Sequence, residues 1–152
     1  MTFRDSASFG KRQEYVAVAE LLKRRFDVYM TLVDDQQIDC VLRFDEDPPR
    51  YVDIQIKARS RNAKHPGTFA AMRVRNPRAS FFFIFFSEAA DCYWVVPSLD
   101  LVARANRNKA GKNAGVYRIV FTNTLKSGEV RPRPKWESYR NNFDLLRAGP
   151  RQ

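Results

Sequence analysis

The chain of 152 residues contains only two cysteines and one histidine, and it has no long apolar run. Cys40 and Cys92 are too few for a disulfide scaffold, and no CxxC pair offers the usual zinc motif. The longest apolar run, residues 81–86, has six residues, far fewer than the roughly 18 that a membrane span needs. Residues 1–6 lack the apolar stretch of a secretory signal. These absences predict a reduced, cytoplasmic protein that does not contact the membrane.

Charge and core-forming residues are plentiful. Hydrophobic residues make up 44% of the chain and aromatic residues 13%, which suits a single folded domain over residues 1–152. The net charge is +10, unevenly divided: residues 1–53 carry 8 basic and 11 acidic side chains, and residues 54–152 carry 19 and 6. A nucleic acid is the expected polyanionic partner. The alternative is that a basic isoelectric point only keeps the protein soluble.

Hydrophobic periodicity predicts the order of the elements in the first half of the chain. A helix is expected over residues 10–25, with an apolar stripe at positions 15, 18, 19, 22 and 26. β-branched and aromatic residues then predict strands at residues 28–33, 38–44 and 51–58, with a turn at residues 34–37 that includes Asp34 and Asp35.

The second half predicts further strands between short helices. Residues 68–74 suit a strand or a helical turn, and residues 80–86 and 92–96 suit a buried hairpin. The remaining expectations are a helix at 98–105, a basic loop at 106–115, a strand at 116–122 and a last helix at 135–147. Trp94 and Trp136 are expected in the core rather than stacked on bases. The fold class is α/β, with a central mixed sheet flanked by helices.

A small set of polar residues is placed where two neighbouring strands meet. Asp39 opens the second strand, and the third strand ends in Gln55, Ile56 and Lys57. In an antiparallel hairpin these positions converge on one rim, which Glu14 of the first helix could also reach. Hydrolysis of a phosphodiester needs such parts: oxygen ligands for Mg²⁺ or Mn²⁺, and an ammonium group beside the water or the phosphate.

With these residues, positions 10–58 resemble the PD-(D/E)xK nuclease superfamily. The chain is most similar to the QxK branch, which includes Mrr-like restriction enzymes and a type of group I intron homing endonuclease. The resemblance implies a restriction-endonuclease-like core, Asp39 as a metal ligand, Gln55 in the second-carboxylate position and Lys57 as the catalytic lysine. Glu14 matches the first-helix glutamate of Holliday-junction resolvases and related enzymes.

The expected metal ligands differ from the family pattern at one position. Gln55 is neutral, so the site should hold Mg²⁺ more weakly unless Glu14 or Asp53 compensates. Asp53 faces the same side of its strand as Gln55, about 7 Å away along the strand, and it is a further candidate for the metal.

Basic residues that follow the third strand are candidates for contacts with the phosphates of a nucleic acid. His65 lies among them, and a phosphate contact or no role at all suits it better than that of a general base. The expected contacts are Arg59, Arg61, Lys64, Arg73 and Arg75.

Together these features predict a Mg²⁺-dependent endonuclease that cleaves DNA. A catalytically inactive nucleic-acid-binding module of the same fold is the main alternative, and a small interaction protein with an acidic partner is another. The sequence does not distinguish duplex DNA, junctions or RNA. The family leads one to expect a homodimer where both strands are cut, although the sequence leaves the oligomeric state open.

Overall fold

The computed structural model describes residues 2–33 and 36–148, and its first element is a long helix, α1 (Phe3–Lys23). The helix begins earlier than the apolar spacing predicted, because Thr2 and Asp5 form a capping box in which each side chain accepts the other's backbone N–H at 3.1 Å. The predicted stripe was partly wrong, since Tyr15, Ala19 and Leu22 are exposed. The side chains that α1 buries are Phe9, Ala17, Val18 and Leu21. Neither α1 nor any other described helix is long and apolar enough to span a bilayer.

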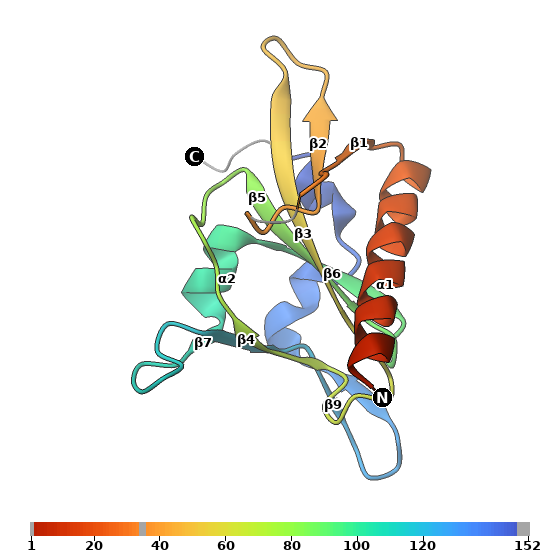
Figure 1. The fold of residues 1–152 in the computed structure, drawn as a ribbon, viewed down its shortest axis with the longest axis vertical. Coiled ribbons are helices and arrows are strands. Elements are labelled where there is room, and N and C mark those ends of the chain that lie inside the picture. The colour runs from red at the N-terminus through yellow and green to blue at the C-terminus, as the bar shows by residue number, and fades with distance from the viewer. Residues whose placement is uncertain (1, 34–35, 149–152) are drawn as a thin grey trace.

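A five-stranded mixed sheet forms the centre of the molecule, in the order β1-β2-β3-β5-β6 (Figure 1). Strands β1 to β3 form an antiparallel meander, β3 pairs in parallel with β5, and β5 and β6 form an antiparallel hairpin. The α/β class with a central mixed sheet is therefore confirmed. The strands are β1 (Asp27–Met30), β2 (Cys40–Phe44), β3 (Arg50–Arg59), β5 (Phe81–Ser87) and β6 (Cys92–Pro97). The predicted turn residues Asp34 and Asp35 lie outside the described residues.

The strands of the meander end at different heights along the sheet. Met30, the last residue of β1, pairs with Cys40, the first residue of β2, and Cys40 pairs with Ile54. Strand β3 continues to Arg59 with β5 on its other side. Among the described strands, none therefore pairs with residues 55–59 on the side of β2. We call this stretch the open edge of β3.

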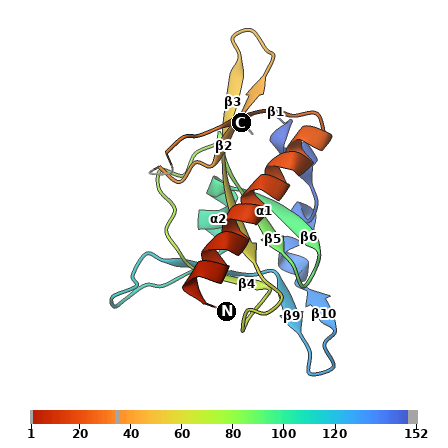
Figure 2. The ribbon, with the colours of Figure 1, turned by 45° about the vertical axis from the view of Figure 1, so that its right-hand side comes forward.

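A smaller sheet comes from the segment between β3 and β5 and from the chain beyond helix α2 (Ser98–Arg104). Its strands β4 (Thr68–Met72), β8 (Tyr117–Val120) and β7 (Asn106–Arg107) pair in the order β4-β8-β7. Residues 68–74, for which the sequence suited either a strand or a helical turn, therefore contain a strand. Two short strands, β9 (Thr122–Thr124) and β10 (Val130–Pro132), form a separate hairpin that projects from the body (Figure 2).

Both faces of the central sheet are covered. Helix α1 and the 3-10 turn η2 (Phe143–Leu146) pack on one face, and the smaller sheet, α2 and the 3-10 turn η1 (Pro134–Tyr139) pack on the other. The second core contains the phenylalanines of β5 together with Trp94 and Trp136. Trp94 stacks on Phe121 with 4.5 Å between ring centroids. The prediction that both tryptophans belong to the core is confirmed.

The predicted last helix over residues 135–147 is wrong, because this segment forms the two turns η1 and η2. Asn141 interrupts it with a φ of 48°, a left-handed conformation that a right-handed helix does not contain. Asn141 donates its backbone N–H to the Tyr93 carbonyl at 2.7 Å, and its side-chain oxygen accepts the Tyr93 N–H at 2.9 Å. Pairing with the edge strand β6 thus replaces a continuous helix.

Candidate active site

Asp39 immediately precedes β2 and lies against the open edge of β3, with only 6% of its surface exposed. Its backbone N–H donates to the Ile54 carbonyl at 2.8 Å. Its Oδ2 accepts the backbone N–H of Ile56 at 2.6 Å, where a longer β2 would have supplied a carbonyl. A hydrogen bond to a charged acceptor at this length is strong and directional, so the backbone of β3 fixes the orientation of the carboxylate.

Gln55 lies beside Asp39 on the same face of the hairpin. The pairing of Cys40 with Ile54 continues by one step to Asp39 and Gln55, and cross-strand partners point to the same side. The side-chain Oε1 of Gln55 is buried and has no hydrogen-bond partner among the described residues. A buried carbonyl oxygen without a partner costs about 1–3 kcal/mol. Such an oxygen next to a carboxylate is a candidate ligand for a cation.

Lys57 follows on the same face of β3, with its Cα about 7 Å beyond that of Gln55 by the rise of a strand. The side chains of Val52, Ile54 and Ile56 alternate with this set and pack in the core beneath α1. Lys57 is half-buried. The structure therefore brings Asp39, Gln55 and Lys57 to one rim of the sheet.

Glu14 approaches this rim from α1. It lies one helical turn before Ala17 and Val18, on the side of the helix that faces the sheet. Its side chain is 21% exposed, and its Oε2 accepts a hydrogen bond from Lys11 Nζ at 3.0 Å. Helix α1 packs on the face of the sheet opposite to the side chains of Asp39 and Gln55. Because β2 ends before the open edge of β3, no described strand lies between Glu14 and that edge.

The charges of Glu14 and Asp39 act on the same two neighbours. The pKa of Lys11 is raised, chiefly by the hydrogen bond and the charge of Glu14 and to a smaller degree by the charge of Asp39. Burial raises the pKa of the Cys40 thiol to about 12, and both carboxylates add to that rise. Glu14 and Asp39 are therefore close enough for both carboxylates to act on Lys11 and Cys40. Our sequence reasoning missed Lys11, although its spacing of three residues from Glu14 was a visible signal.

Asp53, a predicted metal contact, has a cationic partner. Its carboxylate forms an ion pair with Arg78, which lies on the connection leading into β5. Its backbone N–H donates to the Ser80 carbonyl at 2.8 Å. Asp53 pairs with Val41, so it lies one side-chain position farther along the face than Gln55. The structure places Asp53 next to the rim with its charge compensated by a guanidinium.

The predicted phosphate contacts fall into two groups, of which the first follows the end of β3. Arg59 and Lys64 line a hollow of about 290 Å³ beside the N-terminal half of α1. An Nη of Arg59 donates to the His65 carbonyl at 3.4 Å, and exposed Arg61 forms an ion pair with Glu88 at 3.1 Å. These cations border the C-terminal end of the strand that carries Lys57.

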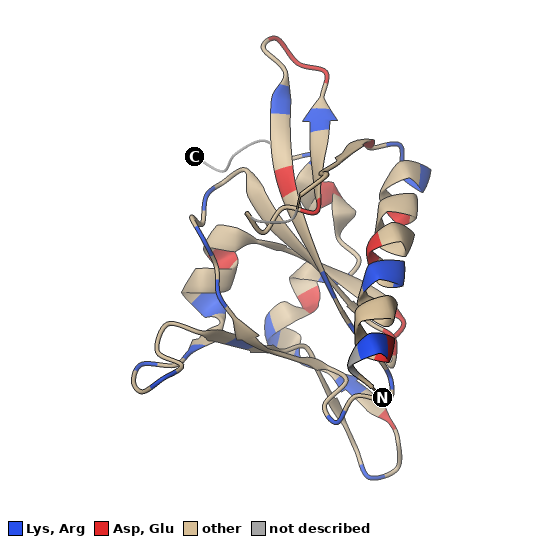
Figure 3. Ribbon diagram, in the orientation of Figure 1, with Lys and Arg blue, Asp and Glu red and all other residues tan. Residues whose placement is uncertain are grey.

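The second group, Arg73 and Arg75, is exposed on the connection between β4 and β5, where Figure 3 shows a run of basic residues. Gln37 of the loop before β2 contacts this connection. Its Nε2 donates to the Arg73 carbonyl at 2.7 Å, and its Oε1 accepts the Arg75 N–H at 2.9 Å. Nothing in the sequence indicated Gln37, because these contacts join residues 36 and 38 positions apart.

The donors at the rim suit a hard divalent cation. Asp39 and Glu14 offer carboxylate oxygens and Gln55 offers an amide oxygen, the ligand type that Mg²⁺ and Mn²⁺ prefer. Cys40 is buried in the core beneath α1, on the opposite face of its strand from Asp39, so it does not add a soft ligand at the rim. Within residues 2–33 and 36–148, no three His, Cys, Asp or Glu side chains form a metal-binding group by themselves. A metal at this rim would therefore depend on the Gln55 amide and on water, which Mg²⁺ usually retains.

These features define an α/β protein in which an acid, an amide and a lysine meet at the open edge of a strand hairpin. In structure the chain is similar to a bacterial homing endonuclease, I-Ssp6803I, with a TM-score of 0.63 over 92% of this chain and 90% of that chain. The two sequences are 20% identical, so the similarity establishes a shared fold. No protein-family model and no curated protein matches the sequence.

Proposed function

We propose that the protein is a metal-dependent nuclease that hydrolyses phosphodiester bonds of DNA as an endonuclease. The observation that carries the proposal is the buried, unpartnered Oε1 of Gln55, which lies beside Asp39 on the face that also bears Lys57. The fold shared with a homing endonuclease supports it. So does the resemblance of these residues to the QxK branch of the PD-(D/E)xK nucleases.

Asp39 and Gln55 would hold Mg²⁺ or Mn²⁺, with Glu14 as a third donor. When bound, such an ion supplies an activated water and offsets the charge that develops on the phosphate. Asp39 is oriented in advance by the Ile56 N–H, and Gln55 offers an oxygen that accepts no competing hydrogen bond from the described residues. The site therefore needs little rearrangement to accept a cation.

Lys57 would act on the substrate. Its ammonium group can donate to the attacking water or to an oxygen of the scissile phosphate, which orients the first and neutralises the second. The backbone of Lys57 is paired with Phe85 of β5 on the side away from the open edge, so one side of the strand is fixed in the sheet. A rigid backbone is what a group needs when its value in catalysis comes from its position.

The two basic groups would hold the phosphates on either side of the scissile bond. Arg59 and Lys64 border one end of the rim, and Arg73 and Arg75 lie on the connection that Gln37 contacts. Contacts of this kind position a nucleic acid without reading its sequence. The family resemblance favours a homodimer, in which each copy of the site cuts one strand of a duplex.

A catalytically inactive DNA-binding module of the same fold is the second candidate. Gln55 is neutral, and the charge of Asp53 is compensated by Arg78. The rim therefore carries less uncompensated negative charge than a site built from two carboxylates on this hairpin. Weak affinity for a cation would leave DNA binding without cleavage.

The substitution Lys57→Ala tests the enzyme. Wild-type protein should nick supercoiled plasmid in Mg²⁺ or Mn²⁺ and not in EDTA, and Lys57→Ala should cut about 10²–10³-fold more slowly, the usual cost of losing one charge-stabilising group. Lys23→Gln removes an exposed lysine at the far end of α1 and should cut at the wild-type rate. DNA affinity in EDTA should be alike for all three proteins.

Equal cleavage by wild type and Lys57→Ala would overturn the catalytic assignment. Salt-sensitive DNA binding that is the same with metal and with chelator, without any nicking, would favour the inactive module.

A further inference from the structure

The connection between β4 and β5 is attached to the active-site hairpin near both of its ends. Near its start, the Gln37 side chain makes hydrogen bonds to the backbone of residues 73 and 75. Near its end, Arg78 forms an ion pair with Asp53 of β3. Ser98 Oγ, at the start of α2, accepts the Arg78 N–H at 3.0 Å and donates to the Arg78 carbonyl at 2.8 Å. We call residues 73–75 the basic arm.

The amide of Gln37 replaces a residue of a neighbouring strand. It donates to the carbonyl of Arg73 and accepts the N–H of Arg75, so it bridges the two backbone groups that flank Val74. A residue in a parallel strand makes the same pair of contacts. The arm is therefore held extended, and Arg73 and Arg75 project to one side of it. Val74 accordingly packs against the second core, while both arginines are exposed.

Gln37, which holds the basic arm, and Asp39, the candidate metal ligand, lie in the same loop. Gln37 lies two residues before Asp39, whose carboxylate is tied to the Ile56 N–H. The position of the arm relative to Asp39 is therefore set by one short stretch of chain. Successive outward side chains of an extended segment are about 7 Å apart, a separation similar to that between neighbouring phosphates on one nucleic-acid strand.

The backbone of Gln37 also indicates that its side chain matters. Its φ is 60°, in the left-handed region that is unfavourable for a non-glycine residue. Glycine would adopt this conformation more easily. The long amide side chain offsets that cost through its two hydrogen bonds to the arm.

We propose that Gln37 is a positioning residue that holds Arg73 and Arg75 against two consecutive phosphates of the strand to be cut. The inference rests on the proposed function and identifies the bound group as the backbone of a nucleic-acid strand on one side of the scissile bond. Because such contacts persist from the bound substrate to the transition state, they act on affinity rather than on turnover.

A double-mutant cycle on DNA affinity in EDTA tests the proposal. Arg73→Ala should weaken binding about tenfold in the wild-type background, the value of a hydrogen bond between charged groups. It should weaken binding less than about twofold in the Gln37→Gly background, since the arm is then no longer held. With Mg²⁺, Gln37→Gly should raise KM several-fold and leave kcat within about twofold.

Gln36→Ala, a change at the exposed neighbour, is the matched control and should alter neither the DNA affinity nor KM. Gln37→Glu keeps the length of the side chain and the acceptor for the Arg75 N–H but places an oxygen against the Arg73 carbonyl. It should give an intermediate loss of affinity even if Gln37→Gly fails to fold.

Equal loss of affinity from Arg73→Ala in both backgrounds would overturn the inference. If Gln37 and Arg73 are strongly coupled in DNA binding but the wild type does not cleave, the nuclease proposal is overturned and the role of the basic arm stands. If the wild type cleaves but the two residues are not coupled, the role of the basic arm is overturned and the nuclease proposal stands.

Discussion

Gln55 presents a buried carbonyl oxygen to a site where no described group donates to it. Two other buried polar side-chain atoms share this property within the described residues, Arg59 Nε and Trp94 Nε1. Trp94 is enclosed in an aromatic core, whereas Gln55 and Arg59 both lie on the strand that carries Lys57. Two of the three unpartnered atoms therefore lie on the strand where we propose that a cation and a phosphate bind, and such binding would relieve their desolvation.

Substitution of Gln55 should separate stability from metal binding. Gln55→Leu removes the unpartnered oxygen, so the protein in EDTA should unfold at an equal or higher temperature, with a gain of up to about 1–3 kcal/mol. The added stability that Mn²⁺ gives the wild type should disappear. Thermal unfolding with and without Mn²⁺ measures both effects.

Gln55→Glu is the informative partner of this variant, because it should be less stable in EDTA and gain more from Mn²⁺ than wild type. A Gln55→Leu protein that loses stability in EDTA and retains the Mn²⁺ effect would show that the oxygen has a structural partner.

The candidate site depends on the unequal lengths of β2 and β3. Strand β2 has 5 residues and β3 has 10, so β3 extends beyond its neighbour and exposes backbone groups. The Asp39 carboxylate accepts one of these, the Ile56 N–H, and thereby becomes part of the sheet. A carboxylate that completes a strand edge is placed as reproducibly as the backbone itself.

The entry into β4 depends on one glycine. A Cβ at Gly67 would overlap the hydroxyl of Thr122 and lie 2.5 Å from its carbonyl oxygen. Gly67→Ala should therefore destabilise the protein by about 1–3 kcal/mol, because β9 must move away. Gly10→Ala is the matched control: a Cβ in the middle of α1 meets nothing within 4 Å, so this change should stabilise by about 0.5–1 kcal/mol. Urea unfolding measures the change in the free energy of unfolding for both variants. An equal change in the two would contradict the close packing of Gly67 against Thr122.

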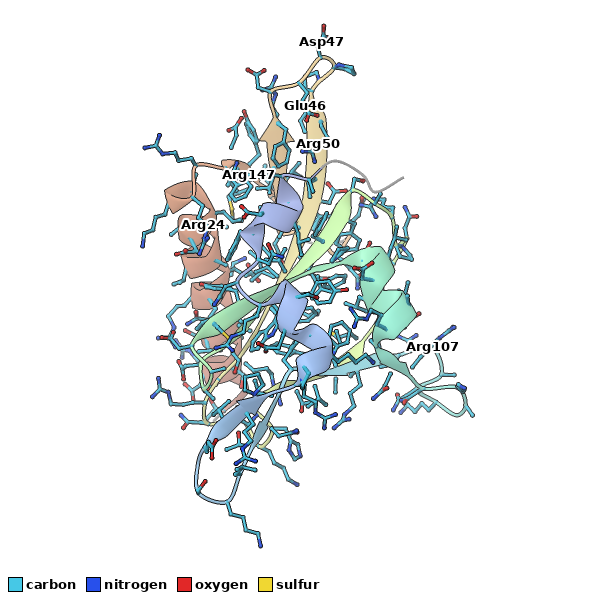
Figure 4. The ribbon with its side chains drawn as sticks, turned by 180° about the vertical axis from the view of Figure 1, so that it is seen from behind. Arg24, Glu46, Asp47, Arg50, Arg107 and Arg147 are labelled. Atoms are coloured by element: carbon cyan, nitrogen blue, oxygen red, sulfur yellow. The ribbon has the colours of Figure 1, made fainter. Side chains whose placement is uncertain are left out.

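The excess positive charge is not all available to a nucleic acid. Seen from behind, Arg24, Arg50 and Arg147 lie around the C-terminal turns (Figure 4). Arg147 stacks on Phe26 and Arg24 on Phe143, each with 4.0 Å to the ring centroid. Arg50 and Arg147 also donate to backbone carbonyls. These arginines hold the C-terminal turns against α1 and β3, so the cations left for the proposed phosphate contacts are those of the loops and the connection that are blue in Figure 3.

DNA affinity should therefore depend steeply on salt. If the five candidate cations contact phosphates of a duplex, the logarithm of Kd should rise with the logarithm of salt concentration with a slope of about 4–5. Lys64→Gln should lower the slope by about one, and Lys23→Gln should leave it unchanged. Fluorescence anisotropy over a salt series measures the slope. A flat dependence, or tighter binding to an acidic protein than to DNA, would favour the interaction-protein alternative.

Local patterns were sufficient for most elements of the fold. Strands β1 to β3, the β5–β6 hairpin and helix α2 follow from alternation, turn residues and apolar runs, which act over a few residues. The last helix was predicted wrongly because Trp136, Tyr139 and Phe143 have helical spacing, whereas the hydrogen bonds between Asn141 and Tyr93 join distant parts of the chain. The start of α1 was missed because its cap uses Asp5 where a glutamate is more usual.

The sequence by itself determined that Asp39, Gln55 and Lys57 would share a rim, because the alternation of a hairpin sets both the register and the face of each side chain. Only the tertiary structure decided the partners around them. The parallel pairing of β3 with β5 returns the basic connection to the hairpin, where Gln37 and Asp53 bind it. Such contacts close loops of tens of residues, and no local periodicity encodes which side chains will meet across them.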